Sequence, residues 1–192
     1  MSLIRGYLTG MQELIDRLPI EAIDRAVDLL HDARRTGKQV FILGNGGSAS
    51  TAAHFVCDLA KNTRQAGRPA LRVIGLADNM AIFSAYANDE GYASVFASQL
   101  ANLLNPGDVV IAISASGKSA NVLAAVEFAA GAGAQTVAFT GFDGGKLGQI
   151  AALNIHVPSE RIEHVEDVHL MLEHIICSAL RARLMSDEAE KI

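Results

Sequence analysis

The stretch that decides the fold is VFILGNGGS, residues 40–48. It opens with four apolar residues, too few for a helix and rich in β-branched and aromatic types, and then changes abruptly to glycines and a serine. This pattern predicts a buried strand that ends in a tight turn. Small and apolar residues follow as far as Asp58 and predict a helix, whose first turn directs unpaired backbone N–H groups and the positive end of the helix dipole at a ligand. The favoured ligand is an anion, most often a phosphate.

The composition indicates one globular domain. A chain of 192 residues is long enough for a single domain with a proper core and too short for two ordinary ones. Half of the residues are apolar and 19% are charged, which excludes a disordered chain. The formal net charge of -5, without any run of Lys or Arg, argues against direct binding of nucleic acid. The low charge and abundant Ala and Gly suggest that another subunit covers part of the surface.

A cytoplasmic location is expected. Cys57 and Cys177 stand apart, without the spacing of a zinc knuckle or a disulfide framework. The first residues lack the apolar core and cleavage site of a signal peptide, and no stretch approaches ~18 uninterrupted apolar residues. We therefore expect neither secretion nor insertion into a membrane.

Strands and helices are expected to alternate from residue 40 onward. Apolar runs predict five strands, at 40–43, 71–75, 109–113, 135–140 and 154–157. Helices are expected after residue 48, at 78–86 with Asp78 as its cap, at about 92–104, after residue 119 and at 166–184. Strands that are apolar throughout indicate a parallel sheet buried on both faces, so the predicted fold is a doubly wound, five-stranded α/β sheet.

Two additional helices precede the first strand. Apolar residues at helical spacing predict them at about 3–18 and 19–35, with Pro19 in the first turn of the second. Within a single domain of residues 1–192, we expect segment 1–36 to pack on the domain's own helices and on a neighbouring subunit. The polar tail, 185–192, is expected to be frayed.

Two loops are candidates for ligand binding, since ligands of doubly wound sheets bind at the carboxyl ends of the strands where the strand order reverses. The first loop, 44–49, fits the dinucleotide pattern G-x-G-x-x-A, but the acid after the next strand is Asp78, much further along than the pattern requires. A glycine turn without a ligand is also plausible there. The second loop, 114–119, ends in Gly-Lys-Ser like a P-loop, but Ala112 stands where a P-loop has glycine.

Hydroxyl groups dominate the second loop. They come from Ser114, Ser116 and Ser119, each of which can donate one hydrogen bond to a phosphate monoester beside the backbone N–H groups of the turn. Serines in loops are more often ordinary caps than ligands. The pairing of this loop with the first one is what favours a phosphate site.

Titratable side chains concentrate on two predicted helices. His54 and Asp58 lie four residues apart and share a helix face, although such a pair alone is more often a surface contact. The last helix carries Glu166, His169, Glu173 and His174 among apolar residues. Charged groups on an apolar helix need partners and are candidates for acid–base or metal chemistry. Glu166 and His174 lie ~12 Å apart along the helix axis, so they serve one centre only if their side chains converge or if two subunits each contribute one.

In combination, these motifs resemble those of bacterial phosphoheptose isomerases of the sugar isomerase (SIS) domain superfamily. The shared motifs, in the same order over essentially the whole chain, are GNGGS at 44–48 with His54, Asn88-Asp89 before a glycine and an aromatic, SxSGxS at 114–119, DGGK at 143–146, and His169 with His174. The resemblance implies a flavodoxin-like SIS domain and a homotetramer with sites at subunit boundaries. It also implies conversion of sedoheptulose 7-phosphate to D-glycero-D-manno-heptose 7-phosphate through an enediol.

The resemblance assigns roles to individual residues. The substrate would be bound by Asn45, Gly46, Gly47, Ser48, Asn88, Asp89, Ser114, Ala115, Ser116, Ser119 and Glu166, with the serines on the phosphate. Asp58 and His174 match the catalytic base and acid. The positions that bind zinc in some members match His54, Asp58, Glu166 and His174, so one zinc ion per site is expected.

The sequence departs from the family at some of these positions. Asp58 stands where the family usually has Glu, and the shorter side chain reaches a carbon-bound proton only with a shift of the backbone or the substrate. Glu166 replaces Gln, and two carboxylates with two imidazoles make a better zinc site than the usual set. Ala115 lacks a hydroxyl group that is often present, and Lys118 replaces Asn, either to strengthen phosphate binding or as a solvated lysine.

Two alternatives to this isomerase remain at the level of sequence. A non-catalytic phosphosugar-binding protein or a regulator like the DnaA initiator-associating protein would keep the fold and lose the reaction, but the presence of both His54 and His174 argues against that loss. The other alternative is isomerisation of a different sugar phosphate, because the sequence does not fix the substrate.

Overall fold

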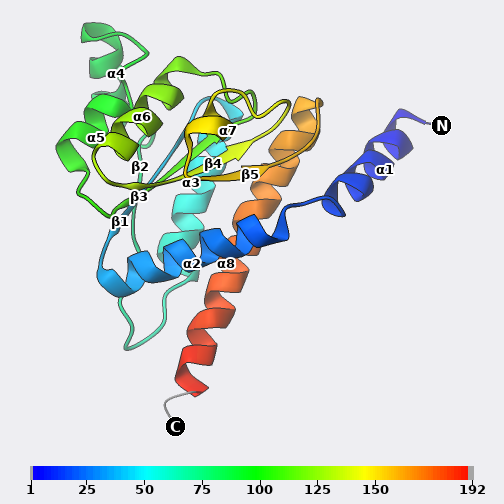
Figure 1. The fold of residues 1–192 in the computed structure, drawn as a ribbon, viewed down its shortest axis with the longest axis horizontal. Helices are drawn as coiled ribbons and strands as arrows, with labels where there is room; N and C mark the ends of the chain where they lie inside the picture. Colours follow the sequence, from blue (N-terminus) through cyan, green and yellow to red (C-terminus); the bar gives the residue numbers. More distant parts are fainter. Residues whose placement is uncertain (1, 190–192) are drawn as a thin grey trace.

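The fold is built on five parallel strands in a single sheet (Figure 1). The computed structural model describes residues 2–189, with side chains for residues 2–184. The strands are β1 (Gln39–Gly44), β2 (Arg72–Gly75), β3 (Val109–Ser114), β4 (Gln135–Thr140) and β5 (Leu153–His156), and they lie in the order β2-β1-β3-β4-β5. Every pairing is parallel, which confirms the predicted five-stranded doubly wound sheet.

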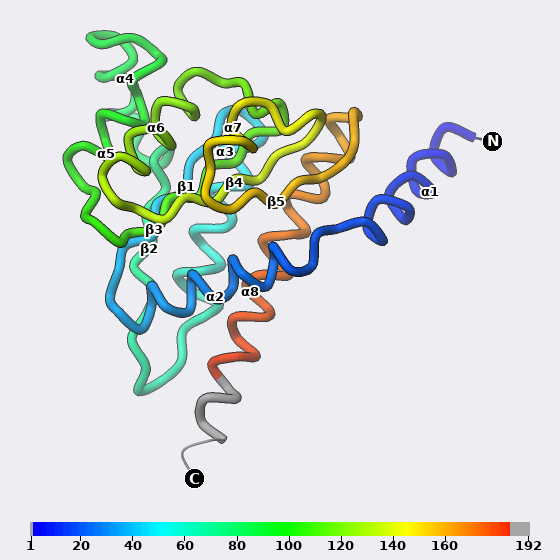
Figure 2. The backbone as a smooth tube through the Cα atoms, viewed as in Figure 1, coloured from blue at the N-terminus to red at the C-terminus, as the bar shows by residue number. Residues whose placement is uncertain are grey.

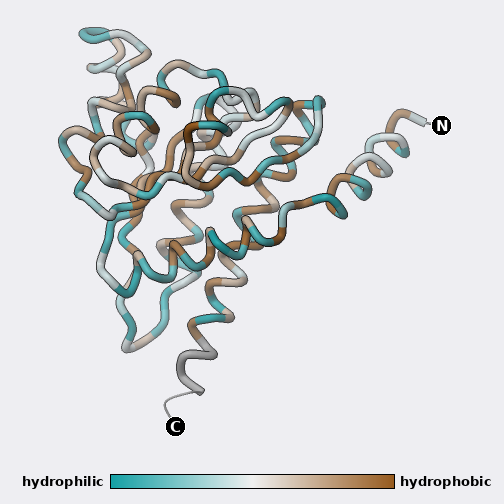
Figure 3. The backbone as a smooth tube through the Cα atoms, in the orientation of Figure 1, coloured by the Kyte–Doolittle hydropathy of each residue, from teal (hydrophilic) through white to brown (hydrophobic). Residues whose placement is uncertain are grey.

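Helices cover both faces of the sheet. One layer holds α2 (Ile20–Thr36), α3 (Gly47–Cys57), the π-helical turn η1 (Asp58–Asn62) and α8 (Ile162–Ala189). The other holds α4 (Met80–Asp89), α5 (Ala97–Leu103), α6 (Ala120–Gly131) and α7 (Leu147–Ile150). Alternate residues of β1 enter the two layers: Val40 and Ile42 pack in the first, and Phe41 and Leu43 in the second. Burial on both faces explains the continuous apolar runs at 40–43 in β1 and 109–113 in β3 (Figure 3).

The first helix, α1 (Leu3–Ile15), extends away from these layers (Figures 1 and 2). The hydroxyl group of Tyr7 donates a 2.5 Å hydrogen bond to Asp167 on α8. The ring of His164 packs against Gly10, where an added Cβ would lie 2.9 Å from Cε1 of the imidazole. These contacts hold α1 on the start of α8 and leave several of its apolar side chains exposed, namely those of Leu3, Ile4, Leu8 and Ile15.

Several helix boundaries differ from the sequence prediction. Asn79, rather than Asp78, caps α4, since its side chain accepts a hydrogen bond from the Ile82 N–H while the carboxylate of Asp78 lies against Gly75. That helix continues to Asp89 instead of ending at residue 86. The expected helix at 92–104 is confined to Ala97–Leu103.

The last helix is longer than predicted at both ends. It begins at Ile162, because Val165 and Val168 already pack against the sheet, and it continues to Ala189. The expected frayed tail therefore overlaps helical residues, while residues 190–192 lie outside the described part of the chain. Among residues 2–189, no helix is both long and apolar enough to cross a membrane.

The chain reverses its direction across the sheet between β1 and β3. From β1 it passes outward to β2 and then returns to β3 on the other side of β1. Gly44, at the end of β1, is in register with Ile113 on β3. The loops at 44–48 and 114–119 therefore begin side by side at the topological switch point, as predicted.

Candidate active site

A pocket of about 160 Å³ lies between the two loops. Its lining residues are Asn45, Ser48, Ile113, Ser114, Ala115, Ser116, Ser119, Ile162 and Glu166. It thus brings together the four serines that the sequence assigns to a phosphate. The pocket lies beside the start of α3, where unpaired N–H groups and the helix dipole favour an anion.

Glycines shape the edge of this pocket. Gly46 has φ 54° and ψ -123°, a conformation that side-chain-bearing residues rarely adopt. Gly47 lies against the carboxylate of Glu166, and a Cβ on Gly47 would be 2.6 Å from Oε1 of that carboxylate. The structure therefore places Glu166 at the edge of the serine-lined pocket.

The side chain of Asn45 is fixed by a network of hydrogen bonds. Its Nδ2 donates to Oδ1 of Asn121, and its Oδ1 accepts from Nδ2 of Asn121, both at 2.9 Å. The hydroxyl group of Tyr92 also donates to Oδ1 of Asn45 at 2.9 Å. Asn121 is buried, so its own orientation is restricted. Neither Asn121 nor Tyr92 is in the predicted site, and no motif in the sequence pairs them with Asn45.

Two predicted substrate residues lie outside the pocket. Asn88 and Asp89 are exposed at the end of α4, where Nδ2 of Asn88 donates to Oδ1 of Asp89 at 2.7 Å. The connection that follows them supplies Tyr92, which contacts Asn45. Lys118, in the second loop, forms a 2.9 Å ion pair with Asp143, and this contact lowers the pKa of the Asp143 carboxyl.

A second cluster lies further along α3 and α8. It consists of His54, Asp58, Glu173 and His174, which offer four ligand atoms within 4.8 Å of one another. Oε1 of Glu173 is 3.3 Å from Nδ1 of His54 and 3.3 Å from Nε2 of His174. Asp58 lies slightly further away, 3.9 Å from the same two rings.

The members of this cluster differ in exposure. The side chains of His54 and His174 are 45% and 49% exposed, that of Asp58 is 14% exposed, and that of Glu173 is completely buried. Neither oxygen of Glu173 has a hydrogen-bond partner among the described residues. Burial, with a smaller contribution from the charge of Asp58, raises the pKa of Glu173 to about 7.

Other titratable groups of α8 have no place in this cluster. His169 is buried, its Nε2 lies 3.3 Å from the carbonyl oxygen of Thr140, and burial lowers its pKa to about 4. It is therefore a neutral core histidine. Burial and the nearby Glu173 raise the pKa of Cys177 to about 12, so this thiol stays protonated and is no nucleophile.

Asp58 begins the π-helical turn η1, which directly continues α3. Its Oδ1 accepts a 2.8 Å hydrogen bond from Nδ2 of Asn62, which fixes the carboxylate and leaves Oδ2 facing His174. Wide turns of this kind occur often at functional sites. Here the turn begins at the residue where the sequence has an unusually short candidate base.

The pocket and the cluster are connected by two helices. Gly47 and His54 on α3 are seven residues apart, as are Glu166 and Glu173 on α8, and both pairs run from the pocket to the cluster. Seven helical residues span ~10 Å. The serine-lined pocket and the cluster of titratable side chains are thus held at a fixed separation along two packed helices.

The cluster has the chemistry of a divalent metal site. Imidazole nitrogens and carboxylate oxygens are ligands that zinc accepts readily. Three of the four predicted ligands, His54, Asp58 and His174, lie together in it, whereas Glu166 lies in the pocket. The fourth group in the cluster is Glu173, and its two unpartnered buried oxygens fit a site that receives a cation. Sequence reasoning identified Glu173 as titratable but gave it no role.

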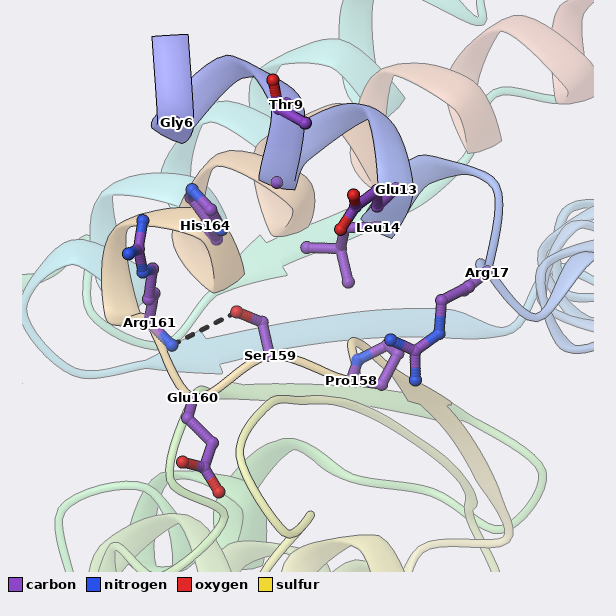
Figure 4. Close-up of a pocket in the computed structure, with 11 residues that line it drawn as sticks. Gly6, Thr9, Glu13, Leu14, Arg17, Pro158, Ser159, Glu160, Arg161 and His164 are labelled. Carbon is purple, nitrogen blue, oxygen red and sulfur yellow. Dashed lines mark hydrogen bonds between the residues drawn. The ribbon is translucent and has the colours of Figure 1, made fainter. Parts of the chain in front are cut away.

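A larger cavity lies elsewhere, between α1 and the start of α8 (Figure 4). Its volume is about 500 Å³, and its walls carry charges of both signs from Glu13, Arg17, Glu160 and Arg161. Figure 4 shows His164 beside α1 at the edge of this cavity. None of the predicted site residues lines it.

Comparison with known proteins indicates the same family as the sequence motifs do. The SIS domain family matches residues 6–141. A phosphoheptose isomerase of Geotalea daltonii is 38% identical, covering 96% of this chain and 97% of that protein. The lincomycin biosynthesis protein LmbN of Streptomyces lincolnensis is also 38% identical, over 93% of this chain and 69% of that protein.

Solved structures agree with these matches. A phosphoheptose isomerase from Francisella tularensis superimposes with a TM-score of 0.86 and 31% identity, over 93% of this chain and 96% of that one. These similarities do not favour the alternative of a non-catalytic regulator. With the predicted fold and the serine pocket in place, the chain belongs to the phosphoheptose isomerase family of SIS domain proteins.

Proposed function

We propose that this protein interconverts an aldose and a ketose phosphate, with sedoheptulose 7-phosphate as the ketose and D-glycero-D-manno-heptose 7-phosphate as the aldose. One observation carries this proposal. A serine-lined pocket lies beside the first turns of α3 and α8, and a cluster of acid–base side chains lies further along the same two helices. Such an arrangement suits a substrate with a phosphate at one end and a reacting carbonyl group at the other. The relatives named phosphoheptose isomerase support the choice of a seven-carbon substrate.

Binding begins at the phosphate. Hydroxyl groups from both loops and the N–H groups at the start of α3 hold it, and the sugar chain extends along α3 toward His54. The network around Asn45 presents a rigid amide to the sugar hydroxyl groups. These contacts hold the substrate in one orientation, so that the reacting carbons lie at the catalytic side chains.

Proton transfer is assigned to Asp58 and His174. Asp58 takes the proton from the carbon next to the carbonyl group, which gives an enediol, and returns it to the neighbouring carbon. His174 moves protons between the two oxygens. Glu173 is completely buried and cannot touch a substrate, whereas the side chain of Asp58 is 14% exposed and its Oδ2 lies 3.9 Å from Nε2 of His174. This difference in exposure supports Asp58 as the base.

We further propose one zinc ion per site. His54, Asp58 and His174 would contribute to holding it, and their donor chemistry supports this choice. When bound, zinc polarises the two substrate oxygens and stabilises negative charge on them.

A homo-oligomer, most simply a tetramer, is part of the proposal. The support is the apolar surface of α1, where Leu3, Ile4 and Leu8 are 89%, 73% and 58% exposed. Sites at subunit boundaries would also bring the exposed Asn88 and Asp89 of one subunit to the pocket of another. A cytoplasmic location is supported by the two free cysteines, Cys57 and Cys177.

The proposed reaction is tested by NMR. The protein is incubated with sedoheptulose 7-phosphate in deuterated water, with and without added zinc, and the appearance of the aldose and of deuterium at the reacting carbon is followed. A panel of five- to eight-carbon ketose phosphates tests the substrate. The proposal fails if no seven-carbon ketose phosphate is converted or exchanges its carbon-bound proton with solvent.

A further inference from the structure

We propose that Glu173 is a direct ligand of the divalent metal, in the place that the family motifs give to Glu166, and that His54 binds this metal through Nδ1 and His174 through Nε2. The inference rests on the proposed function, since it concerns the metal of the same site. It goes further by naming the ligand atoms.

The burial of Glu173 is the first argument. Its side chain is completely buried. Leu172 and Ile176, which flank it on α8, both belong to the hydrophobic core. A buried carboxyl group is costly unless it is hydrogen-bonded, paired with a positive charge or bound to a metal. Both oxygens of Glu173 lack a hydrogen-bond partner within the described residues. A cation between Glu173 and the two histidines would remove this cost.

The distances are the second argument. Oε1 of Glu173 is 3.3 Å from Nδ1 of His54 and 3.3 Å from Nε2 of His174, yet neither contact is a hydrogen bond. In tetrahedral zinc sites with bonds of about 2.0–2.1 Å, neighbouring ligand atoms lie about 3.3 Å apart. The two contacts therefore match two edges of a coordination tetrahedron better than they match hydrogen bonds.

Asp58 completes the set at a longer distance. Its Oδ2 is 3.9 Å from Nε2 of His174, and its Oδ1 is already bound by Asn62. His54, Glu173 and His174 would hold the metal, so Oδ2 of Asp58 would be free to receive a proton from the substrate. This division explains how Asp58 can serve both as a ligand and as a base.

Within one chain, the position of Glu166 keeps it out of the cluster. Its carboxylate lies against Gly47 in the phosphate pocket, and the side chain belongs to the helix two turns, ~10 Å, before Glu173. Glu166 would have to leave this pocket to join the cluster. Glu173 already lies in contact distance of both histidines.

One competing arrangement uses the same residues. In it, His54 binds the metal through Nε2 and donates its Nδ1–H to Glu173, which then acts from outside the ligand set. The two arrangements differ in which ring nitrogen of His54 carries the metal and which carries the proton. That difference is directly measurable in the unmodified protein.

The first experiment therefore uses the full wild-type chain with ¹⁵N-labelled histidine. Long-range ¹H–¹⁵N spectra are recorded with stoichiometric Zn²⁺ and with a chelator, and the rings are assigned from His54→Gln and His174→Gln. We expect Nδ1 of His54 and Nε2 of His174 to show metal-bound shifts. A metal-bound Nε2 with a protonated Nδ1 on His54 overturns the inference, as does a wild-type protein that binds no zinc.

The second experiment compares two matched variants, Glu173→Leu and Glu166→Leu, because leucine has no donor atom whereas glutamine keeps an oxygen that can bind a metal. Zinc affinity is measured by competition with a chromophoric chelator, and circular dichroism and gel filtration check the fold. Loss of a direct ligand at 173 should weaken zinc binding by roughly 100-fold or more, beyond the 10- to 100-fold typical of groups outside the ligand set, while Glu166→Leu should change it by less than about 3-fold. The reverse order contradicts the inference, and if Glu173→Leu does not fold, the NMR experiment decides.

These readouts are independent of turnover. A protein that binds zinc as described but converts no sugar phosphate refutes the proposed reaction and leaves the ligand assignment intact. A protein that isomerises the sugar phosphate, with zinc affinity insensitive to Glu173→Leu, refutes the ligand assignment alone.

Discussion

The carboxylate of Glu166 lies against Gly47 at the first turn of α3, where an added Cβ would be only 2.6 Å from Oε1. The carboxylate of Glu166 thus lies at the edge of the pocket proposed for the phosphate, beside the N-terminus of α3, which favours anions. Glutamine at this position would keep the shape of the side chain without the charge. Glu166 therefore tunes the electrostatic balance of the pocket.

Glu166→Gln should bind inorganic phosphate several-fold more tightly than the wild type, because it removes repulsion between two negative groups in one pocket. Calorimetric titration at two salt concentrations measures this, and the difference should shrink at high salt. Glu127→Gln, which removes an exposed carboxylate of α6 paired with Lys146, is the matched control and should have no effect. Unchanged or weaker phosphate binding by Glu166→Gln would contradict the electrostatic argument.

Asp58→Asn should abolish isomerisation, with a loss of at least about 10²–10⁴ in kcat, because the amide cannot accept the carbon-bound proton. Phosphate binding should be retained, since Asp58 lies outside the serine pocket. Asn62→Ala should cause a smaller loss, because it frees Oδ1 of Asp58 without removing the carboxylate. Turnover and deuterium incorporation measure both effects, and full activity of Asp58→Asn would require another base.

Asn121→Ala should raise KM for the sugar phosphate, because it removes both hydrogen bonds that orient the amide of Asn45. It should also lower the free energy of unfolding by about 1–3 kcal/mol, since partners of the buried Asn121 lose their hydrogen bonds. Tyr92→Phe removes a single bond from an exposed residue and should have the smaller effect on both. Steady-state kinetics and urea denaturation compare the two variants. An equal or larger effect of Tyr92→Phe would contradict the prediction.

The metal-free protein should lose stability as the pH rises from about 4.5 to about 7. Burial raises the pKa of Glu173 from 4.5 to about 7, so the folded state holds a proton in this range that the unfolded state has released. Stability falls with pH wherever the folded state binds more protons. Glu173→Gln should lack this component and be more stable than the wild type at pH 8 in the presence of a chelator. Denaturation curves at several pH values provide the test, and identical slopes for both proteins would disprove it.

Leu8→Glu should shift the protein toward smaller assemblies, because it places a charge on the exposed apolar face of α1 proposed for subunit contact. Leu103→Glu is the matched control, since Leu103 is also exposed, at 43%, but lies on α5 in the other layer. Sedimentation velocity measures the assembly state of each. An unchanged assembly for Leu8→Glu would place the contact elsewhere.

The fold was predictable because its signals are local. Strands β1 and β3 are buried on both faces, so each contains a continuous apolar run, and this pattern is visible without any knowledge of contacts. The glycine turn after β1 and the serines after β3 mark their carboxyl ends in the same way. Helix boundaries were harder to predict from the sequence. Asn79 caps α4 because the carboxylate of Asp78 packs against Gly75 instead, and this contact is not visible in the sequence.

The sequence by itself determined the doubly wound sheet, the two loops at its switch point, and the presence of histidines and carboxylates on the helices that follow β1 and β5. It could not decide between Glu166 and Glu173, because residues seven apart occupy the same face of a helix, two turns from each other. Only the packing of α3 along α8 distinguishes them: it sets Glu166 against Gly47 beside the serine-lined pocket and buries Glu173 beside His54 and His174. Spacing fixes the face of a helix, and tertiary contact fixes which turn of that face meets its partner.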